Sequence, residues 1–301
     1  MSQASTHCRW GVLGYSQRGA SHIRQSLPNQ DTITHSVAED GAPPVILAVA
    51  DGHGSAKSFR SDVGAQFAVE TAVEVCREFL EVMQGAAAST VKSEAELKIP
   101  ARIFQRWRQR VEEHFGQNPF TDAELARLAE QGGETARDRA TGPKQLHVAY
   151  GATLLVAVVT SQFLICFQLG DGDILAVSDS TGIADRVIPK DDSLIANETT
   201  SLCQDDGQRY MRFRFQLLQG GVPPAMVLLS TDGYSNSFAT PDAFLKAGAD
   251  YLDMLRTDGA DEVEKNLPAW LEETSRNGSG DDITVGIIYR REPLLARGTS
   301  V

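Results

Sequence analysis

The residues most able to do chemistry in this chain lie in three short acidic segments, each at the end of an apolar run. Asp51-Gly52-His53-Gly54 follows Val45–Ala50, Ser230-Thr231-Asp232-Gly233 follows Met226–Leu229, and Gly280-Asp281-Asp282 leads into Ile283–Tyr289. Carboxylates at the ends of neighbouring strands point into the same space, and they repel one another unless cations lie between them. The pattern therefore predicts a metal site.

Hard divalent cations such as Mg²⁺ and Mn²⁺ prefer oxygen ligands, so a few carboxylates and a main-chain carbonyl are enough to bind them. Gly52 and Gly54 would let the backbone approach a cation closely, and Gly233 would let the chain turn sharply after Asp232. Asp-Gly is also a common turn pair, so one such segment alone says little. Three acidic segments together favour a catalytic role for His53 over a role in a turn.

The overall composition is that of a globular protein. The chain has 301 residues, of which 42% are hydrophobic, and a formal net charge of −12. We expect one domain over residues 1–301, with a hydrophobic core spanning about residues 10–290. The acidity argues against binding to nucleic acid, because phosphate neutralisation requires a basic face.

Neither a membrane span nor an export signal is expected. The apolar stretch Ala152–Phe167 is interrupted by Thr160-Ser161-Gln162, so it predicts two strands and a turn. The N-terminal residues lack the basic and apolar regions of a signal peptide, which favours a cytoplasmic location. The four cysteines lie far apart without the spacing of zinc ligands, and we expect them to be reduced.

Short apolar runs bounded by Gly, Asp or Pro predict a mainly antiparallel β structure, for which two packed sheets are the natural arrangement. The predicted strands are Trp10–Ser16, Thr32–Val37, Val45–Ala50, Ala152–Thr160, Phe163–Leu169, Ile174–Ser178, Arg212–Leu218, Met226–Ser230 and Ile283–Tyr289. Apolar residues at three- to four-residue spacing predict helices in two blocks, within residues 59–132 and 240–276. The expected fold class is α+β, with helices bracketing a central β region.

Three segments between these elements are distinctive. Thr121 and Glu124 have the spacing of a capping box, which predicts the start of a short helix. Residues 84–93 and 132–145 lack periodicity and are expected to be loosely structured. The polar segment 190–210 interrupts the β pattern shortly before the Asp232 motif and is a candidate flap beside the site.

These motifs occur in the order that is typical of the metal-dependent PPM-type (2C-type) serine/threonine protein phosphatases. The segments that carry the resemblance are Asn29-Gln30-Asp31, Asp51-Gly52-His53-Gly54, Gly151-Ala152-Thr153, Gly170-Asp171-Gly172-Asp173, Ser230-Thr231-Asp232-Gly233 and Asp281-Asp282-Ile283-Thr284-Val285. The chain resembles a bacterial-type branch of this family over about residues 10–290. The resemblance implies a four-layer α/β/β/α sandwich, in which two mainly antiparallel sheets are flanked by pairs of helices.

The same resemblance implies two Mn²⁺ or Mg²⁺ ions between the sheets, and a third ion bound weakly. The implied metal ligands are Asp31, Asp51, Gly52, Asp171, Asp232 and Asp282. Asp51 would bridge the two ions, and a water shared by them would attack phosphorus. His53 would protonate the departing seryl or threonyl oxygen. Asp281 would orient its loop while Asp282 points inward, because neighbouring strand residues face opposite ways.

Two positions depart from the family pattern. Gln30 stands where many members have Glu, which removes a charge and predicts weaker binding of one metal ion. Ser26 stands at the usual place of a phosphate-binding arginine. Arg24 or Arg18, together with His22, could supply the missing cation, and we favour Arg24 because it is nearer in sequence.

The leading hypothesis is a metal-dependent hydrolase of phosphoserine and phosphothreonine on proteins that are substrates of a Ser/Thr kinase. Two alternatives stay open: a pseudophosphatase that binds a partner without catalysis, and a phosphatase for a small phosphorylated metabolite. The joint presence of Asp51, His53, Asp232 and Asp282 favours catalysis, because a binding module has no physical need for all four.

Overall fold

Two five-stranded antiparallel sheets form the centre of the molecule, in a computed structural model that describes residues 8–132, 146–190, 199–218 and 223–291. The first sheet has the order β1 (Trp10–Gln17), β10 (Ile283–Arg290), β9 (Met226–Ser230), β6 (Asp173–Val177) and β7 (Ala184–Arg186). The second has the order β2 (Asp31–Ser36), β3 (Val45–Asp51), β4 (Leu154–Val159), β5 (Phe163–Leu169) and β8 (Arg212–Leu217).

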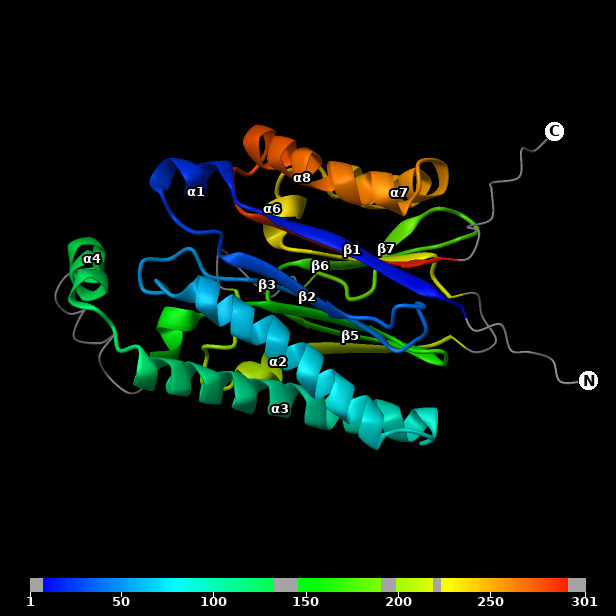
Figure 1. The fold of residues 1–301 in the computed structure, drawn as a ribbon, viewed down its shortest axis with the longest axis horizontal. Helices are drawn as coiled ribbons and strands as arrows, with labels where there is room; N and C mark the ends of the chain where they lie inside the picture. The colour runs from blue at the N-terminus through cyan, green and yellow to red at the C-terminus, as the bar shows by residue number, and fades with distance from the viewer. Residues whose placement is uncertain (1–7, 133–145, 191–198, 219–222, 292–301) are drawn as a thin grey trace, which may run out of the picture.

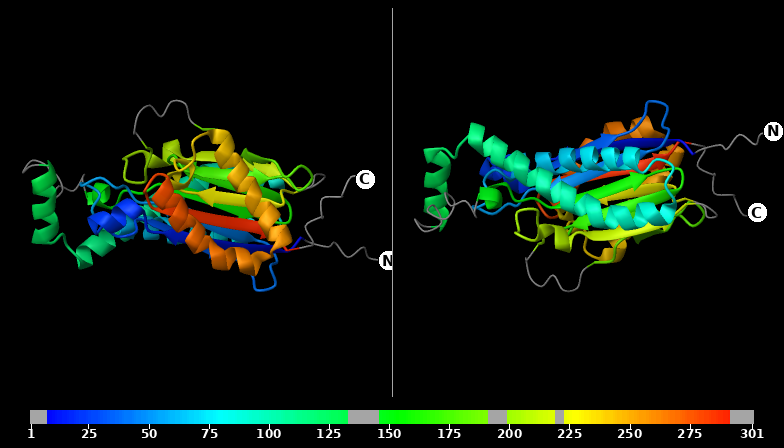
Figure 2. Two further views of the ribbon diagram at one scale, coloured as in Figure 1. Left: turned by 90° about the horizontal axis from the view of Figure 1, so that it is seen from above. Right: turned by 90° about the horizontal axis from the view of Figure 1, so that it is seen from below.

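Helices cover the outer faces of both sheets (Figures 1 and 2). The long helices α2 (Ser61–Val82) and α3 (Ala88–Gln117) pack on the second sheet, whereas α7 (Pro241–Thr257) and α8 (Ala260–Asn277) pack on the first. Shorter elements are α1 (Ala20–Gln25), α4 (Asp122–Gly132), α6 (Asp232–Ser235) and the 3₁₀ turns η1 (Leu146–Tyr150) and η2 (Gly207–Tyr210). The prediction of a four-layer α+β sandwich is confirmed.

The burial pattern explains these layers. Residues Val45–Ala50 of β3 are all buried, because one face packs on α2 and the other on the first sheet. The apolar layer between the sheets includes Leu47, Val49, Leu155, Val227 and Leu229. A continuous apolar run, without polar alternation, is typical of a strand that is covered on both sides. The central strands are therefore rigidly held, and so are the residues at their ends.

Helix boundaries agree with the sequence signals in some places and not in others. Thr121 Oγ1 accepts a hydrogen bond from the Glu124 N–H at 3.2 Å, and Glu124 Oε2 accepts one from the Thr121 N–H at 2.7 Å, so the capping box is confirmed. The expectation of a loose segment at residues 84–93 is wrong from Ala88 onward, where α3 begins. Val91, Ala95 and Ile99 are buried at four-residue spacing, so the apolar stripe of α3 extends back into this segment.

Some sequence expectations lie outside the described residues. They are most of the loose segment 132–145 and residues 191–198 of the candidate flap. Among the described helices, none has both the length and the apolar character needed to cross a membrane.

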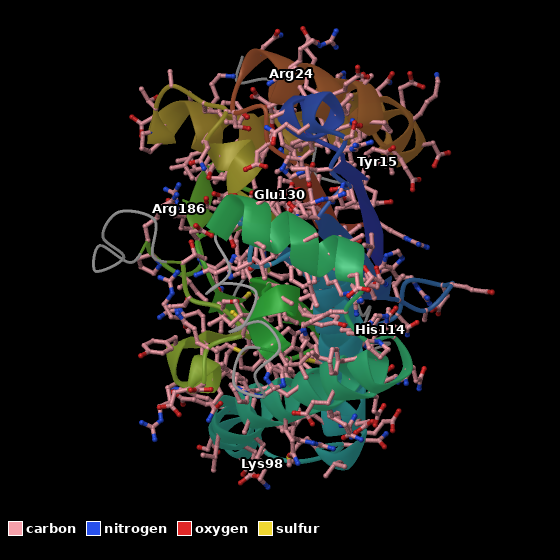
Figure 3. All side chains as sticks on the ribbon, turned by 90° about the vertical axis from the view of Figure 1, so that its left-hand side faces the viewer. Tyr15, Arg24, Lys98, His114, Glu130 and Arg186 are labelled. Carbon is pink, nitrogen blue, oxygen red and sulfur yellow. The ribbon has the colours of Figure 1, made fainter. Side chains whose placement is uncertain are left out.

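The ends of the central strands meet at one end of the sandwich, which faces the viewer in Figure 3. Asp51 ends β3, Asp171 lies in the turn between β5 and β6, Asp232 follows β9, and Asp281 precedes β10. The two sheets thus contribute acidic residues to one place. Helix α4, which carries the labelled Glu130, stands in front of this end of the molecule.

Candidate metal centre and catalytic pocket

A cavity of about 370 Å³ opens where the strand ends meet. Its lining includes Gln30, Asp51, Gly52, His53, Thr153, Asp171, Asp232 and Asp281. Of the predicted site residues, Asp51, Gly52, His53, Asp171, Asp232 and His22 lie in this lining, whereas Asp31, Asp282 and Arg24 do not. Four aspartates and a histidine from segments that are distant in sequence therefore share one space.

The β3 end of the cavity is held by a close approach of backbones. Asp51 pairs with Asp31 across β2 and β3, and the Gly52 N–H donates to the Gln30 carbonyl at 3.0 Å. A Cβ atom on Gly52 would lie 2.6 Å from the Ser61 carbonyl oxygen, so only glycine fits here. The Thr153 hydroxyl lies within hydrogen-bonding distance of the Asp51 main chain and fixes this strand end.

Burial and mutual repulsion both act on the carboxylates of this cavity. Burial raises the pKa of Asp51 well above its ordinary value, and the charges of Asp31 and Asp232 raise it further. The pKa of Asp232 rises to about 6, first through burial and then through Asp171 and other neighbours. Within the described lining of the cavity no Arg or Lys offsets these charges, and a divalent cation would relieve the repulsion.

Asp31 sits behind the cavity with 6% of its surface exposed. Its Oδ2 accepts a hydrogen bond from the Thr231 hydroxyl at 2.7 Å. Burial raises the pKa of Asp31 well above its usual range, and the charge of Asp282 adds to the effect. Asp31 is therefore a buried neighbour of the cavity carboxylates, outside the lining of the cavity.

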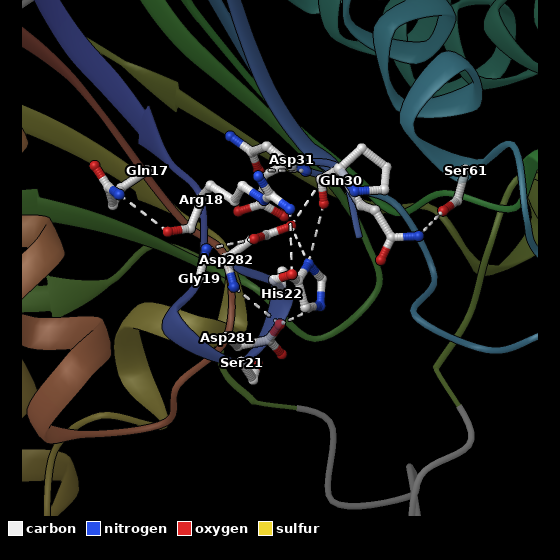
Figure 4. Close-up of polar contacts among 12 residues, drawn as sticks. Gln17, Arg18, Gly19, Ser21, His22, Gln30, Asp31, Ser61, Asp281 and Asp282 are labelled. Carbon is white, nitrogen blue, oxygen red and sulfur yellow. Dashed lines mark hydrogen bonds and ion pairs between the residues drawn. The ribbon is translucent and has the colours of Figure 1, made fainter. Parts of the chain in front are cut away.

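The two aspartates before β10 lie the other way round from the sequence expectation. Asp281 lines the cavity, whereas Asp282 is 3% exposed and points away from it. The two carboxylate oxygens of Asp282 accept hydrogen bonds from the N–H groups of Gly19 at 2.6 Å and Gln30 at 2.7 Å. Neighbouring residues were expected to face opposite ways, and it is Asp281 that lines the cavity, while Asp282 is held by Gly19 and Gln30 (Figure 4).

The imidazole of His22 also binds this pair (Figure 4). Its Nδ1 lies 2.8 Å from Asp282 Oδ2, and its Nε2 lies 3.4 Å from Asp281 Oδ1. The hydrogen bond to Asp282 raises the pKa of His22 despite the opposing effect of burial. His22 is thus committed to orienting two carboxylates.

The arginines that were expected to bind phosphate lie elsewhere. Arg24 is exposed on α1, at the outer side of the molecule (Figure 3). Arg18 Nη2 donates to the main-chain carbonyl of His22 at 3.2 Å. Among the described residues that line the cavity, none is Arg or Lys.

His53 is held against glycine on one wall. Its N–H donates to the Gly151 carbonyl at 3.0 Å, and a Cβ atom on Gly151 would lie 2.5 Å from the imidazole Cδ2. Burial lowers the pKa of His53, while Asp171 opposes this change and Lys57 adds to it. An imidazolium with a lowered pKa is a stronger acid but is less populated near neutral pH.

Two further residues of the cavity were missed as site residues or were given no structural role. The carboxamide Nε2 of Gln30 donates to Ser61 Oγ at 2.7 Å, while its Oε1 is buried and meets no hydrogen-bond partner among the described residues. Thr199 donates its hydroxyl to Asp171 Oδ2 at 2.6 Å. The proximity of Thr199 has no local signal, since 27 residues separate it from Asp171 in the sequence.

Comparison with known protein families identifies the chain. The model of the family described as protein phosphatase 2C matches residues 18–272. The chain belongs to the protein phosphatase 2C family. A comparison with curated protein sequences gives no significant match.

Solved structures of bacterial 2C phosphatases have the same fold. The Mycobacterium tuberculosis serine/threonine phosphatase PstP/Ppp has 16% identity and a TM-score of 0.56, covering 94% of this chain and 99% of that chain. PppA, a regulatory component of T6SS in Pseudomonas aeruginosa, has 16% identity and a TM-score of 0.54, covering 94% and 98%. The S. agalactiae serine/threonine phosphatase has the same two values and covers 94% and 100%.

The donor set of this member of the 2C family suits hard divalent cations in its chemistry. All the acidic groups of the cavity offer oxygen, and the raised pKa values of Asp51, Asp232 and Asp281 reflect burial together with repulsion from nearby carboxylates. Within the ranges that the structure describes, no three His, Cys, Asp or Glu side chains are already grouped so as to hold an ion. The residue types therefore suit Mn²⁺ or Mg²⁺, whereas a ligand shell is not preformed.

Proposed function

We propose that this chain is a Mn²⁺- or Mg²⁺-dependent phosphatase that hydrolyses phosphoserine and phosphothreonine on proteins, opposing a Ser/Thr kinase. The observation that carries the proposal is the gathering of four aspartates and His53 in one cavity of a 2C-family fold. A structure of the catalytic domain of PstP, which is similar to this chain, is reported in complex with two manganese ions. The single domain expected over residues 1–301 is likewise a proposal, supported by the pairing of β1 with β10.

The proposed ligands are Asp51, the Gly52 carbonyl, Asp232 and Asp281, with Asp171 as the ligand of a third ion. Asp281 takes the place first given to Asp282, because Asp281 lines the cavity and both oxygens of Asp282 bind main-chain N–H groups. When bound, two divalent cations supply an acidified water and offset the charge of a phosphoryl group.

The chain's own residues would then hold the reacting groups. His53 would donate a proton to the departing seryl or threonyl oxygen, and its fixed position against Gly151 suits that task. His22 would keep Asp281 and Asp282 in place through its two ring nitrogens. Since no Arg or Lys is found in the described lining of the cavity, the cations would provide most of the positive charge for the phosphate.

A pseudophosphatase is the second candidate, and two observations favour it. Gln30 contributes no charge where many family members have Glu, and the described lining of the cavity contains no arginine or lysine. Both features would weaken binding of metal and phosphate. The acidic residues and His53 nevertheless make hydrolysis the better proposal, because partner binding alone does not require them.

Turnover of p-nitrophenyl phosphate tests the two candidates. We expect the wild type to hydrolyse it with Mn²⁺, to lose activity in EDTA, and to recover when Mn²⁺ is returned in excess. Asp51→Ala should be inactive, whereas Asp185→Ala, which alters an exposed aspartate of β7, is the matched control. Activity that survives both EDTA and Asp51→Ala would exclude the proposed mechanism, and a folded but inactive wild type would favour the pseudophosphatase.

A second assay separates the substrate classes. Phosphoserine and phosphothreonine peptides should be hydrolysed with higher kcat/KM than sugar phosphates of similar charge, because a peptide also contacts the surface around the cavity. The reverse order would favour the alternative of a small phosphorylated metabolite.

A further inference from the structure

A second cavity, of about 330 Å³, adjoins the catalytic cavity and shares two residues with it. His53 and Thr199 line both, and Lys57, Ser201, Cys203 and Asp205 complete much of the wall of the second. His53 thus stands between the two spaces. A substrate segment next to the phosphorylated residue would reach the second cavity, since consecutive residues of an extended chain advance by roughly 3.3–3.6 Å.

The wall formed by residues 199–203 is tied to the catalytic residues. Thr199 binds the Asp171 carboxylate, and the Leu202 N–H donates to the Ala152 carbonyl at 3.0 Å. A Cβ atom on Gly151 would lie 2.5 Å from the His53 ring and 3.1 Å from the Cys203 sulfur, so these two side chains flank the same glycine. The second cavity therefore has a fixed position relative to the proposed proton donor.

The two cavities differ in charge: the described lining of the catalytic cavity has aspartates and no Arg or Lys, whereas that of the second has Lys57 as well as Asp205. Burial raises the pKa of the Cys203 thiol, and the hydrogen bond from Ser201 and the charges of Lys57 and Arg108 oppose this rise. Lys57 is exposed, and within the described part of the chain it forms no hydrogen bond or ion pair. Asp205 opposes these cations, but its side chain is 88% exposed and faces Arg108 at 3.7 Å.

We propose that the second cavity is a substrate subsite for an anionic side chain, Asp or Glu, near the phosphorylated residue of a phosphoprotein, and that Lys57 is its specificity-determining residue. This inference rests on the proposed function, because it assigns the sequence preference of that reaction. The geometry points to a side chain and not to the phosphate itself, since His53 separates Lys57 from the acidic cavity.

The occupant follows from charge complementarity. The ammonium of Lys57 has no counter-charge of its own among the described residues, and an incoming carboxylate would supply one at little desolvation cost because the cavity is open to solvent. A basic substrate residue would instead be repelled by Lys57. The preference would therefore distinguish acidic from basic phosphorylation motifs.

The test uses a panel of phosphothreonine peptides that carry one Asp at one, two or three positions on either side of the phosphothreonine. Matched peptides carry Asn or Lys at the same position. We expect the wild type with Mn²⁺ to favour Asp at one position by about three- to tenfold in kcat/KM, mainly through KM. Lys57→Glu should reverse the order of the Asp and Lys peptides, and Lys57→Arg should retain it.

Lys92→Glu is the matched control, because it makes the same change in net charge on α3, near the other end of β4. The position preference should be unchanged in this variant. The proposal is overturned if Lys57→Glu leaves the ratio of Asp to Lys peptides as it is in the wild type, or if Lys92→Glu changes that ratio equally.

Binding of the same peptides, followed by fluorescence anisotropy, keeps this test separate from the test of hydrolysis. If the wild type binds the Asp peptide more tightly but hydrolyses neither, the proposed function fails and the subsite stands. If it hydrolyses all peptides with no preference at any position, the proposed function stands and the subsite fails. Absence of both binding and preference overturns the subsite as well.

Discussion

Aspartates at the two ends of the sandwich have different charged neighbours. Asp179, beyond the end of β6, is surrounded by arginine: Arg256 Nη2 lies 2.7 Å from its Oδ1, and Arg290 pairs with its other oxygen. Asp51 and Asp232, at the catalytic end, have mainly other aspartates as charged neighbours. The charge of Asp179 is neutralised by arginines of the chain itself, whereas the charges of Asp51 and Asp232 are left for a bound cation.

The largest expected effect is the loss of catalysis when an aspartate of the catalytic cavity is replaced. Asp51→Asn should lower kcat/KM for p-nitrophenyl phosphate by at least about 1,000-fold, equivalent to about 4 kcal/mol, because a proposed metal ligand is lost. The same variant should be as stable as the wild type in EDTA, or more so, since it removes a repelled charge. Thermal unfolding in EDTA checks the second part, and a strong loss of stability there would contradict it.

Replacement of Asp179, the aspartate that is paired with arginines, should lower stability instead of activity. Asp179→Asn leaves Arg256 and Arg290 without their buried counter-charge, so we expect the free energy of unfolding to fall by about 3 kcal/mol. Urea denaturation measures this loss. Specific activity per folded molecule should change little, and a loss of activity as great as that of Asp51→Asn would remove the distinction between the two ends of the sandwich.

The raised pKa of Asp232 predicts a pH effect on the metal-free protein. Its folded pKa of about 6 lies above the ordinary aspartate value of 3.8, so the folded state binds the proton more tightly. The resulting stabilisation is complete below about pH 4 and is lost as the pH rises through 6, by up to about 3 kcal/mol. The difference in unfolding free energy between wild type and Asp232→Asn in EDTA should therefore change across this window, and a constant difference would refute the prediction.

A smaller effect is expected when a further negative charge is added beside the catalytic cavity. Gln30→Glu should lower the Kd for Mn²⁺ by about three- to tenfold, because it adds a carboxylate beside the acidic cavity. Without metal, the same variant should unfold at a lower temperature than the wild type. Calorimetric titration with Mn²⁺ measures the affinity, and unchanged or weaker binding would show that Gln30 does not limit it.

The layers of this fold were predictable from the sequence, whereas the partners of individual side chains were not. The apolar run of β3 and the capping box at Thr121 are local signals, and the structure confirms both. Strand β7, only three residues long, carries too little pattern to be recognised and was missed. Residues 88–93 begin α3 because Val91 and Ala95 extend the apolar stripe of that helix, a signal that is weak because most residues around them are polar or small.

The candidate site shows the same division. The acidic segments indicated a shared cavity, but alternation along a strand tells only that Asp281 and Asp282 face opposite ways. The choice between them depends on Gly19 and Gln30, whose N–H groups come from more than 250 positions away in the chain. Likewise, the exposure of Arg24 follows from the direction of α1, which nearness in sequence does not reveal.

Both sheets carry carboxylates of the catalytic cavity: Asp51 ends a strand of one sheet, and Asp232 and Asp281 flank strands of the other. Any ion that engages residues from both sides is also a crosslink between the sheets. Metal binding should consequently slow amide hydrogen exchange at the ends of β3 and β9 together. Metal occupancy could then be followed by these exchange rates in the absence of substrate.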